Sequence, residues 1–398
     1  MTDHSDNSVW PCRLKPKPDE LLSSWLVRQS AGLVVKLQTF TTRHLALHAG
    51  FWTNDVDRSN NQQLFSKLSE YINVPLAVAS QTSLSAFTGK LWEQYSTGPL
   101  AFINSIGKYG RKRLNYGQQY CRLCLIDDAE PYFRKSWRLS FNVSCALHDV
   151  YLRDSCPTCK SPVVFHTGDF GKVFIPEECQ ITVCQHCQSD FRVAPFDEEM
   201  TIPREIKRMQ TWLYECLHNG FGSIDGRREY SALLIFSGVR KLLSTYTSSS
   251  RIHRITTDLK HLYGALDLHS ESLNRKPFET LRIGDRAWAL MGLYRMLDGW
   301  PSEFVRLLKE NRISSSYMND YGTELPYWLL KELKWHVFDE DYAPSADEVE
   351  SVKRYLNAIK VPFSQSDINL LLGTSAVSLR KKTTRKRWNP RGQVNQQS

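Results

Sequence analysis

Apolar residues recur every three or four positions near the start of the chain, which predicts an amphipathic helix. Pro18 favours an extended lead-in to this helix, and we expect Asp19 to cap the free amides of its first turn. The apolar face of the predicted helix consists of Leu21, Leu22, Trp25 and Leu26.

Two further helices are predicted at residues 64–71 and 76–84, with a turn at residues 73–75 between them. This order is that of a helix-turn-helix, which contacts DNA or a partner, and equally that of a plain helical hairpin. The residues alone leave both interpretations open.

The last apolar stretch predicts another pair of helices. Residues 364–367 can cap a helix that contains Ile368 and Leu372, Gly373 can supply a left-handed turn, and residues 375–382 begin a second helix. Because this second helix runs into basic residues, a helix-turn-helix that places charge against phosphates is one interpretation. A hairpin that docks on a partner is the other.

The middle of the chain contains four pairs of potential metal ligands, and two residues separate the members of each pair. A gap of two lets one tight turn direct both side chains at the same ion, and two such turns complete the tetrahedron that Zn²⁺ prefers. A disulfide framework or a redox motif explains four such pairs less well, so we predict two structural zinc ions per chain. The eight ligands are Cys121, Cys124, Cys145, His148, Cys156, Cys159, Cys184 and Cys187.

The spacing of the pairs favours sequential ligation, with one Cys₃His set followed by one Cys₄ set. In a cross-braced arrangement the first pair would join the third, but the seven residues between His148 and Cys156 are more than such bracing usually has. Each set already has four protein ligands, so we expect structural and not catalytic metals. The remaining candidates are substitute ligands or packing residues, namely Cys12, Cys179, Cys216, His166 and His186.

Aromatic residues between the first two ligand pairs follow two periodicities at once. Phe133, Trp137 and Phe141 have helical spacing, whereas Trp137, Leu139, Phe141 and Val143 alternate as in a strand. The sequence does not decide between helix and strand, but in either case we expect these rings to pack against the zinc loops and not to stack on bases.

These patterns predict a mainly α fold in four parts. Helical spacing dominates residues 201–345, although the Ser/Thr-rich run 244–250 indicates a connector. The parts are an N-terminal helical domain of the helix-turn-helix type (1–110), a tandem zinc-binding, zinc-ribbon-like module (111–200), a helical domain (201–345), and a C-terminal helix-turn-helix-like segment with a basic tail (346–398).

The positive charge of the chain is concentrated at its end. Lys and Arg number 51 against 42 acidic residues, for a net charge of +9, and residues 380–398 contain seven basic side chains and no acid. Such a cluster binds nucleic acid by releasing counterions, or forms a solvated tail with non-specific affinity only. The candidate nucleic-acid contacts there are Arg380, Lys381, Lys382, Arg385, Lys386 and Arg387.

A second basic run lies inside the chain, before the first cysteine pair. It is a candidate phosphate-contact patch, or a solvated face whose charges pair with Asp127, Asp128 and Glu130. The run comprises Lys108, Arg111, Lys112 and Arg113, with Arg122 further along.

Several classes of protein are disfavoured by what the sequence lacks. Ordinary glycine and proline contents argue against collagen-like and wholly disordered chains. We find no phosphate-binding loop, metalloprotease motif, nucleophile elbow or dinucleotide fingerprint, so we expect a protein that is not an enzyme. The polar first residues and the absence of a long apolar run lead us to expect a cytoplasmic, nucleoid-associated bacterial protein.

Several short motifs resemble the TniQ/TnsD family of bacterial transposon proteins, which select the insertion site. The resemblance covers residues 15–190, with Glu20-Leu21-Leu22 and Arg122 as small departures that touch no metal ligand. The motifs are Pro16-x-Pro18-Asp19-Glu20-x-Leu22-x-Ser24-Trp25-Leu26-x-Arg28, Tyr120-Cys121-x-x-Cys124-Leu125, Pro131-Tyr132-Phe133-Arg134-x-x-Trp137-Arg138, Cys145-x-x-His148 and Cys156-Pro157-x-Cys159.

The resemblance implies an adaptor that joins target-site recognition to recruitment of the transposon AAA+ ATPase (TnsC/TniB-like) and its transposase. The target is recognised either through a CRISPR Cascade complex with guide RNA or by direct DNA binding, and some members form homodimers. A zinc-dependent, sequence-specific DNA-binding protein, as a TnsD-like site reader or regulator, is the alternative.

Overall fold

The computed structural model describes residues 9–48, 50–109, 112–113, 115–176, 180–193, 202–247, 276–310, 325–336 and 345–372. The chain divides into two compact units, Met1–Leu307 and Leu308–Ser398. Within the described residues the structure is mainly helical, with two short hairpins as its only sheets. None of the helices in this part of the chain has the length and apolarity needed to cross a bilayer. The predicted division into four parts stays a prediction.

The first unit begins with short helices around one apolar core. Trp25, Phe40 and Phe65 are buried at its centre, and α1, α2 and the following turns close around them. The elements are α1 (Leu22–Gly32), α2 (Leu37–Thr39), the π-helix η1 (Phe40–His44), the 3₁₀-helices η2 (Phe51–Thr53) and η3 (Val56–Arg58), α3 (Gln62–Ile72), α4 (Leu76–Ser80) and η4 (Leu84–Phe87).

The predicted helix, turn and helix at residues 64–84 are present as α3, a turn and α4, and the two helices contact each other. Asn61 caps α3 by accepting the Leu64 N–H at 3.2 Å, and Asn73 ends it in the left-handed conformation at φ 57°. The second helix is shorter than predicted because α4 ends at Ser80. Use of this pair as a DNA-binding motif stays a prediction.

The metal-ligand segment has little regular structure of its own. It contains the hairpin β1 (Lys108–Tyr109) with β2 (Lys112–Arg113), α5 (Arg122–Asp127) and the 3₁₀-helix η5 (Lys135–Arg138). Trp137 lies in η5, whereas Phe133 and Phe141 lie in irregular chain, so neither the predicted helix nor the predicted strand forms. All three rings are buried as expected, and Phe133 stacks on Phe165 with ring centroids 4.0 Å apart.

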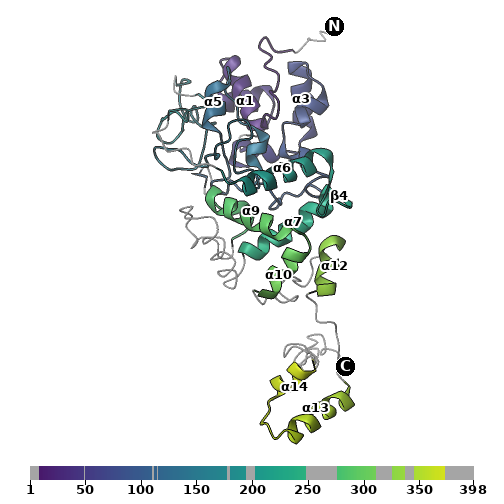
Figure 1. Ribbon diagram of the computed structural model, residues 1–398. Helices are drawn as coiled ribbons and strands as arrows, with labels where there is room; N and C mark the ends of the chain where they lie inside the picture. Colours follow the sequence, from purple (N-terminus) through teal and green to yellow (C-terminus); the bar gives the residue numbers. More distant parts are fainter. Residues whose placement is uncertain are drawn as a thin grey trace, which may run out of the picture. The chain divides into compact units, whose positions relative to one another are not determined.

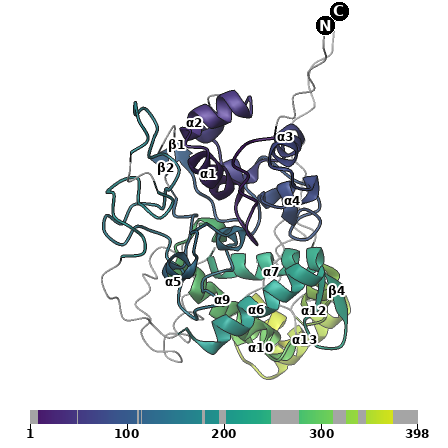
Figure 2. The same cartoon turned by 90° about the horizontal axis from the view of Figure 1, so that it is seen from above.

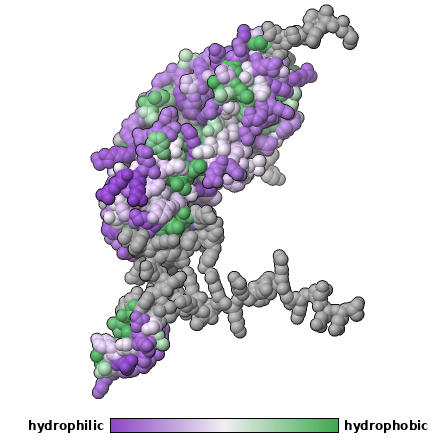
Figure 3. Space-filling model, turned by 90° about the vertical axis from the view of Figure 1, so that its right-hand side faces the viewer, coloured by the Kyte–Doolittle hydropathy of each residue, from purple (hydrophilic) through white to green (hydrophobic). Residues whose placement is uncertain are grey.

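Three longer helices follow and lie side by side (Figures 1 and 2). They are α6 (Arg204–Asn219), α7 (Ala232–Thr247) and α9 (Ile283–Leu297); the hairpin of β3 (Phe221–Ser223) and β4 (Glu229–Ser231) joins the first two, and η8 (Phe278–Thr280) precedes the third. The boundary between the two compact units falls within α10 (Ser302–Glu310). On the face drawn in Figure 3, apolar side chains form several small areas among polar ones.

The second unit contains α12 (Tyr327–His336), α13 (Ala346–Ala358) and α14 (Gln365–Leu371). Ser345 and Glu348 form a capping box at the start of α13. The predicted helix start at residue 364 is confirmed, because the Ser364 N–H donates to Asp367 Oδ2 at 2.7 Å. The predicted second helix, residues 375–382, lies outside the described residues.

Two local predictions were wrong. Asp19 does not cap α1, since its Oδ2 accepts the Ser136 N–H at 3.0 Å and the helix begins only at Leu22. Part of the expected connector at 244–250 is helical, because α7 continues to Thr247. The Ser244 hydroxyl donates to the Lys241 carbonyl, so a polar side chain is accommodated within the helix.

Candidate metal centre

The eight predicted ligands form two groups in the structure. Within each group, one ligand atom from every residue lies within 4.8 Å of the others. Residues 121, 124, 145 and 148 form the first set, and residues 156, 159, 184 and 187 form the second set. The groups therefore follow the sequential arrangement.

The first ligand pair is built into the start of a helix. Cys121 is the N-cap of α5, and its Sγ accepts the Cys124 N–H at 3.5 Å. Tyr120, directly before it, pairs with Arg153 through two backbone hydrogen bonds of 2.9 and 2.8 Å. The chain thereby brings the first pair next to the segment that joins the second and third pairs.

The other three pairs share one tight turn, and the first cysteine of each pair defines its geometry. The N–H of this cysteine donates to the carbonyl five residues ahead, its own carbonyl accepts the N–H four residues ahead, and a β-bridge closes the turn. The residue that follows each pair has a positive φ of 56°, 59° and 63° at Asp149, Lys160 and Gln188. The sequence thus repeats one ligand-presenting turn three times.

The left-handed residue of this turn offers a test of the repeat. Because non-glycine residues pay about 1 kcal/mol or more in the left-handed region, we expect Lys160→Gly to raise the free energy of unfolding by about 0.5–1 kcal/mol. Thr158→Gly, at an exposed position of the same turn, should lower it. Thermal unfolding with zinc present measures both changes, and a loss of stability in Lys160→Gly would contradict the assigned turn geometry.

The distances in the first set fit one tetrahedral ion. Nδ1 of His148 lies 3.6, 3.3 and 3.6 Å from the sulfur atoms of Cys121, Cys124 and Cys145, and the last two sulfurs are 3.5 Å apart. In a zinc tetrahedron with Zn–S bonds of about 2.3 Å, the sulfur atoms are about 3.8 Å apart. The first set therefore has the size and the donor chemistry of a Cys₃His zinc site.

The second set has matching dimensions with four sulfur donors. Sγ of Cys156 lies 3.6 Å from that of Cys187, and Sγ of Cys159 lies 3.8 Å from that of Cys184. Burial raises the pKa of the Cys187 thiol, but hydrogen bonds led by those of Ser189 outweigh this effect and lower its pKa to about 6. A thiol that ionises this readily suits a zinc ligand, since the thiolate is the form that binds.

A carboxylate supports the histidine of the first set from outside. Nε2 of His148 donates to Asp127 Oδ2 at 2.8 Å, which leaves Nδ1 to face the three sulfurs. Asp127 ends α5, the helix that also contains Cys124. The pairing fixes both the tautomer and the ring orientation, which is the usual role of a carboxylate behind a metal-bound histidine.

We expect Asp127→Asn to weaken zinc retention by the first set about 10- to 100-fold while the second set keeps its ion. Competition with a chromogenic chelator measures the release of each ion. Asp128→Asn is a matched control, because Asp128 pairs with Arg134 at 2.9 Å and not with a ligand. Equal retention in Asp127→Asn and the parent protein would refute the supporting role.

Helices that follow the metal-ligand segment hold both sets in place. Gln210 of α6 accepts the N–H groups of Val143 and Ser144, directly before Cys145, at 2.9 and 3.0 Å. Arg282, the N-cap of α9, pairs with Asp154 before the second set at 2.8 Å. The two sets are therefore anchored to the long helices of the first unit and not only to each other.

The other candidate ligands lie apart from both sets. His166 is buried and stacks on Trp52 with ring centroids 5.0 Å apart, and His186 is exposed. Cys216 is buried on α6, where burial raises the pKa of its thiol to about 12, and Cys12 is half-buried near Gly32. Cys179 lies outside the described residues.

Most candidate nucleic-acid residues cannot be placed in the structure. Arg111 and the six basic residues of the tail lie outside the described residues, and Lys108, Lys112 and Arg113 are described only as strand backbone. The acids proposed to neutralise this run have other partners: Asp127 pairs with His148, Asp128 with Arg134, and Glu130 with Lys17 and Arg28. Arg122 donates to the Arg192 carbonyl at 3.2 Å.

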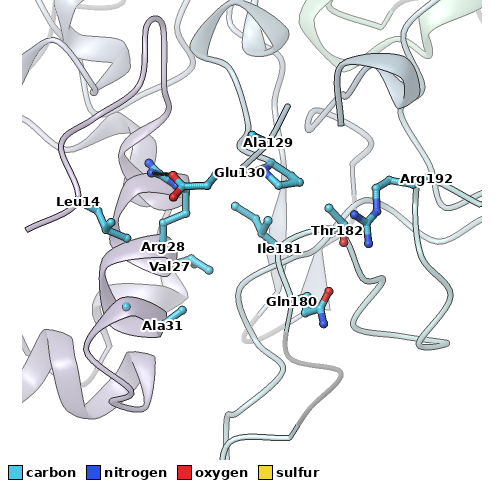
Figure 4. A pocket seen from close by; sticks show the side chains of 12 residues that line it. Leu14, Val27, Arg28, Ala31, Ala129, Glu130, Gln180, Ile181, Thr182 and Arg192 are labelled. Atoms are coloured by element: carbon cyan, nitrogen blue, oxygen red, sulfur yellow. Dashed lines mark hydrogen bonds and ion pairs between the residues drawn. The ribbon is translucent and has the colours of Figure 1, made fainter. Parts of the chain in front are cut away.

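A pocket of about 390 Å³ separates α1 from the chain beside the second set. Figure 4 shows Val27 and Ala31 of α1 on one side and Ile181 and Thr182 on the other. The pair of Arg28 and Glu130, with an N–O distance of 2.9 Å, also lines the pocket. The second set thus shapes a surface that α1 shares.

The sequence analysis missed Asp127, Gln210 and Asp154 as supporting residues. Only Asp127 left a signal, because it follows the C-x-x-C pair by three residues at the end of the same predicted turn. Gln210 and Asp154 are separated in sequence from the groups that they contact by 66 and 128 residues.

Comparison with known proteins gives one match. Residues 11–152 match the TniQ family model. The matched region contains the whole first set and ends before the second. None of the curated proteins compared with the chain matches it.

Proposed function

Since residues 11–152 place the chain in the TniQ family and imply a part in transposition targeting, we propose that it is a targeting adaptor. It links recognition of a target site to recruitment of the transposon AAA+ ATPase and, through that ATPase, the transposase. The TniQ match, together with the first ligand set folded inside it, is the observation that carries this proposal.

The two ligand sets support a structural role in this adaptor. Each set provides four protein donors, which leaves no position for a substrate or an activated water, and we propose no enzymatic activity. Zinc, when bound, would cross-link turns that contain little regular secondary structure. The residues around it would then keep α1, α5 and α6 in a fixed arrangement for docking.

The decisive test is binding of the AAA+ ATPase encoded beside this gene. Purified protein and ATPase should co-elute on size exclusion in the presence of ATP, with either target DNA or the Cascade complex with its guide RNA added. Separation of the two proteins under every one of these conditions would refute the adaptor. The same runs report whether the adaptor is a homodimer.

A DNA-reading function is favoured by one observation, the basic segment 380–398. A TnsD-like reader must enrich a sequence from random duplexes without help, whereas a Cascade-linked adaptor need not. Selection by gel shift from a random duplex library separates the two. A single enriched motif supports the reader, and uniform recovery supports the Cascade-linked form.

The basic segment gives a further prediction. Changing Arg380, Lys381 and Lys382 to Ala should leave folding intact, weaken nucleic-acid binding and flatten its dependence on salt by about one logarithmic unit per lost phosphate contact. The matched control changes three cations of the same unit, Lys353, Arg354 and Lys360, to Ala. Unchanged affinity and slope in the tail variant would show that the tail is inert.

A further inference from the structure

A second concave site lies beside α4, far along the sequence from its other wall. This α4 groove has a volume of about 560 Å³. Residues 16–20 of the N-terminal motif form one wall, residues 77–82 form the other, and Lys135 of η5 lines it as well. Three segments distant in sequence thus contribute to one surface.

The walls of the groove are held in place by the backbone. Glu20 accepts the Lys17 N–H at 2.8 Å, and the Leu22 N–H donates to the Thr82 carbonyl at 2.9 Å. The Lys135 N–H donates to the Asp19 carbonyl at 2.6 Å. The groove is therefore a preformed feature of the fold.

Lys135 is the unusual residue of this site. It is 8% exposed, yet within the described residues no carboxylate oxygen lies within ion-pair distance of its Nζ. Its ammonium donates to the Gln81 carbonyl and lies 5.3 Å from the Phe87 ring centroid, which leaves donor capacity for another acceptor. A buried cation without a counterion is costly, so a carboxylate that reached it would gain a strong hydrogen bond.

The two acids of the groove do not fill that role. Glu20 is already paired with Arg28 at 2.7 Å, and Oδ2 of Asp19 accepts the Ser136 N–H. Lys17 shares its charge with Glu130 at 2.9 Å. Lys135 is thus the cation of the groove that an incoming acid can use.

The composition of α4 indicates a protein partner and not DNA. Its five residues, Leu-Ala-Val-Ala-Ser, carry no charge, and Leu76 and Val78 are 44% and 41% exposed. A helix that enters a DNA groove needs cations for the phosphates and polar side chains for the bases. Exposed aliphatic side chains beside a buried ammonium are instead complementary to a segment with one acid and one apolar residue.

We propose that the α4 groove binds a short segment of a partner protein in which Asp or Glu stands beside an apolar residue. The carboxylate pairs with Lys135, and the apolar side chain packs on Leu76 and Val78. This inference rests on the proposed function, because an adaptor must dock on protein partners, and it supplies the chemistry of one docking site.

The test uses the full zinc-loaded chain and two pools of fluorescein-labelled octapeptides. The acidic pool has Glu at position 4, an apolar residue (Leu, Ile or Phe) at position 5 or 6, and Gly or Ser elsewhere; the matched pool has Gln in place of Glu. Fluorescence anisotropy should show that the acidic pool binds at least about tenfold more tightly. No preference between the pools would overturn the inference.

Variants then locate the site. Lys135→Met should abolish the preference for Glu, whereas Lys67→Met should keep it, because Lys67 also donates to a backbone carbonyl but lies outside the groove. Val78→Asp should weaken binding of the acidic pool, and Val173→Asp, at an exposed valine away from the groove, should not. Circular dichroism and zinc content verify that each variant is folded.

The remaining outcomes separate this inference from the proposed function. If Lys135→Met retains the preference, or lowers binding of a 20-base-pair duplex and not of the peptides, the peptide groove is refuted. An ATPase that binds a chain without any preference between the pools leaves the adaptor standing and removes the groove. Discrimination between the pools by a chain that does not bind the ATPase has the reverse meaning.

Discussion

Cys121→Ser and Cys156→Ser should each prevent stable folding of the chain. Each removes one of four ligands from a set whose binding energy is folding energy, on the order of 10 kcal/mol per site. That is comparable to the whole stability of an ordinary domain, and neither segment has enough regular structure to fold without its ion. We expect aggregation or loss of native tryptophan fluorescence in both variants.

The metal content of the parent protein provides the accompanying measurement. Mass spectrometry of metals should find about two zinc ions per chain, and chelation should unfold the protein. Cys216→Ser is the matched control, since Cys216 is equally buried but lies outside both sets. A value of one ion or none, or a folded and metal-free Cys121→Ser, would contradict the two-site account.

Arg138→Met should lower the free energy of unfolding by about 3–5 kcal/mol. The Arg138 side chain is 0% exposed and donates to Asp55 at 2.6 Å, to Asp57 at 3.2 Å and to the Asn104 carbonyl at 3.1 Å. Removing its charge leaves two carboxylates facing each other in the interior. Urea unfolding followed by tryptophan fluorescence measures the change.

Two companion variants test the cause of this loss. Adding Asp57→Asn to Arg138→Met should restore part of the stability, because it removes one of the carboxylates left without a partner. Arg306→Met, which breaks an exposed ion pair with Glu303, should change the stability by no more than about 0.5 kcal/mol. A midpoint for Arg138→Met equal to that of the parent protein would show that the buried pair contributes nothing.

The metal-ligand sets could be predicted from sequence because their geometry is local. Three of the four pairs lie in one tight turn, and two residues between ligands are enough to specify it. The helix faces around Trp25 and Phe65 were equally accessible, because burial follows the helical period.

The start of α1 could not be predicted because its partners are distant in the chain. The Ser23 N–H is bound by Asp57 at 2.8 Å, and the Leu22 N–H by the Thr82 carbonyl, so tertiary contacts replace the local cap expected from Asp19. The aromatic segment around Trp137 obeyed neither periodicity for a related reason. Its rings are buried by packing on residues such as Phe165, which leaves the backbone free of helix or strand.

The central claim is that this chain directs where a transposon inserts. The most direct measurement is sequencing of insertion sites in cells that carry the transposon with this gene deleted, and with it restored. The account predicts that deletion abolishes insertion at the preferred target and that restoration recovers it, whereas a chain with Cys121→Ser does not. An unchanged distribution of insertions in the deletion strain would contradict it.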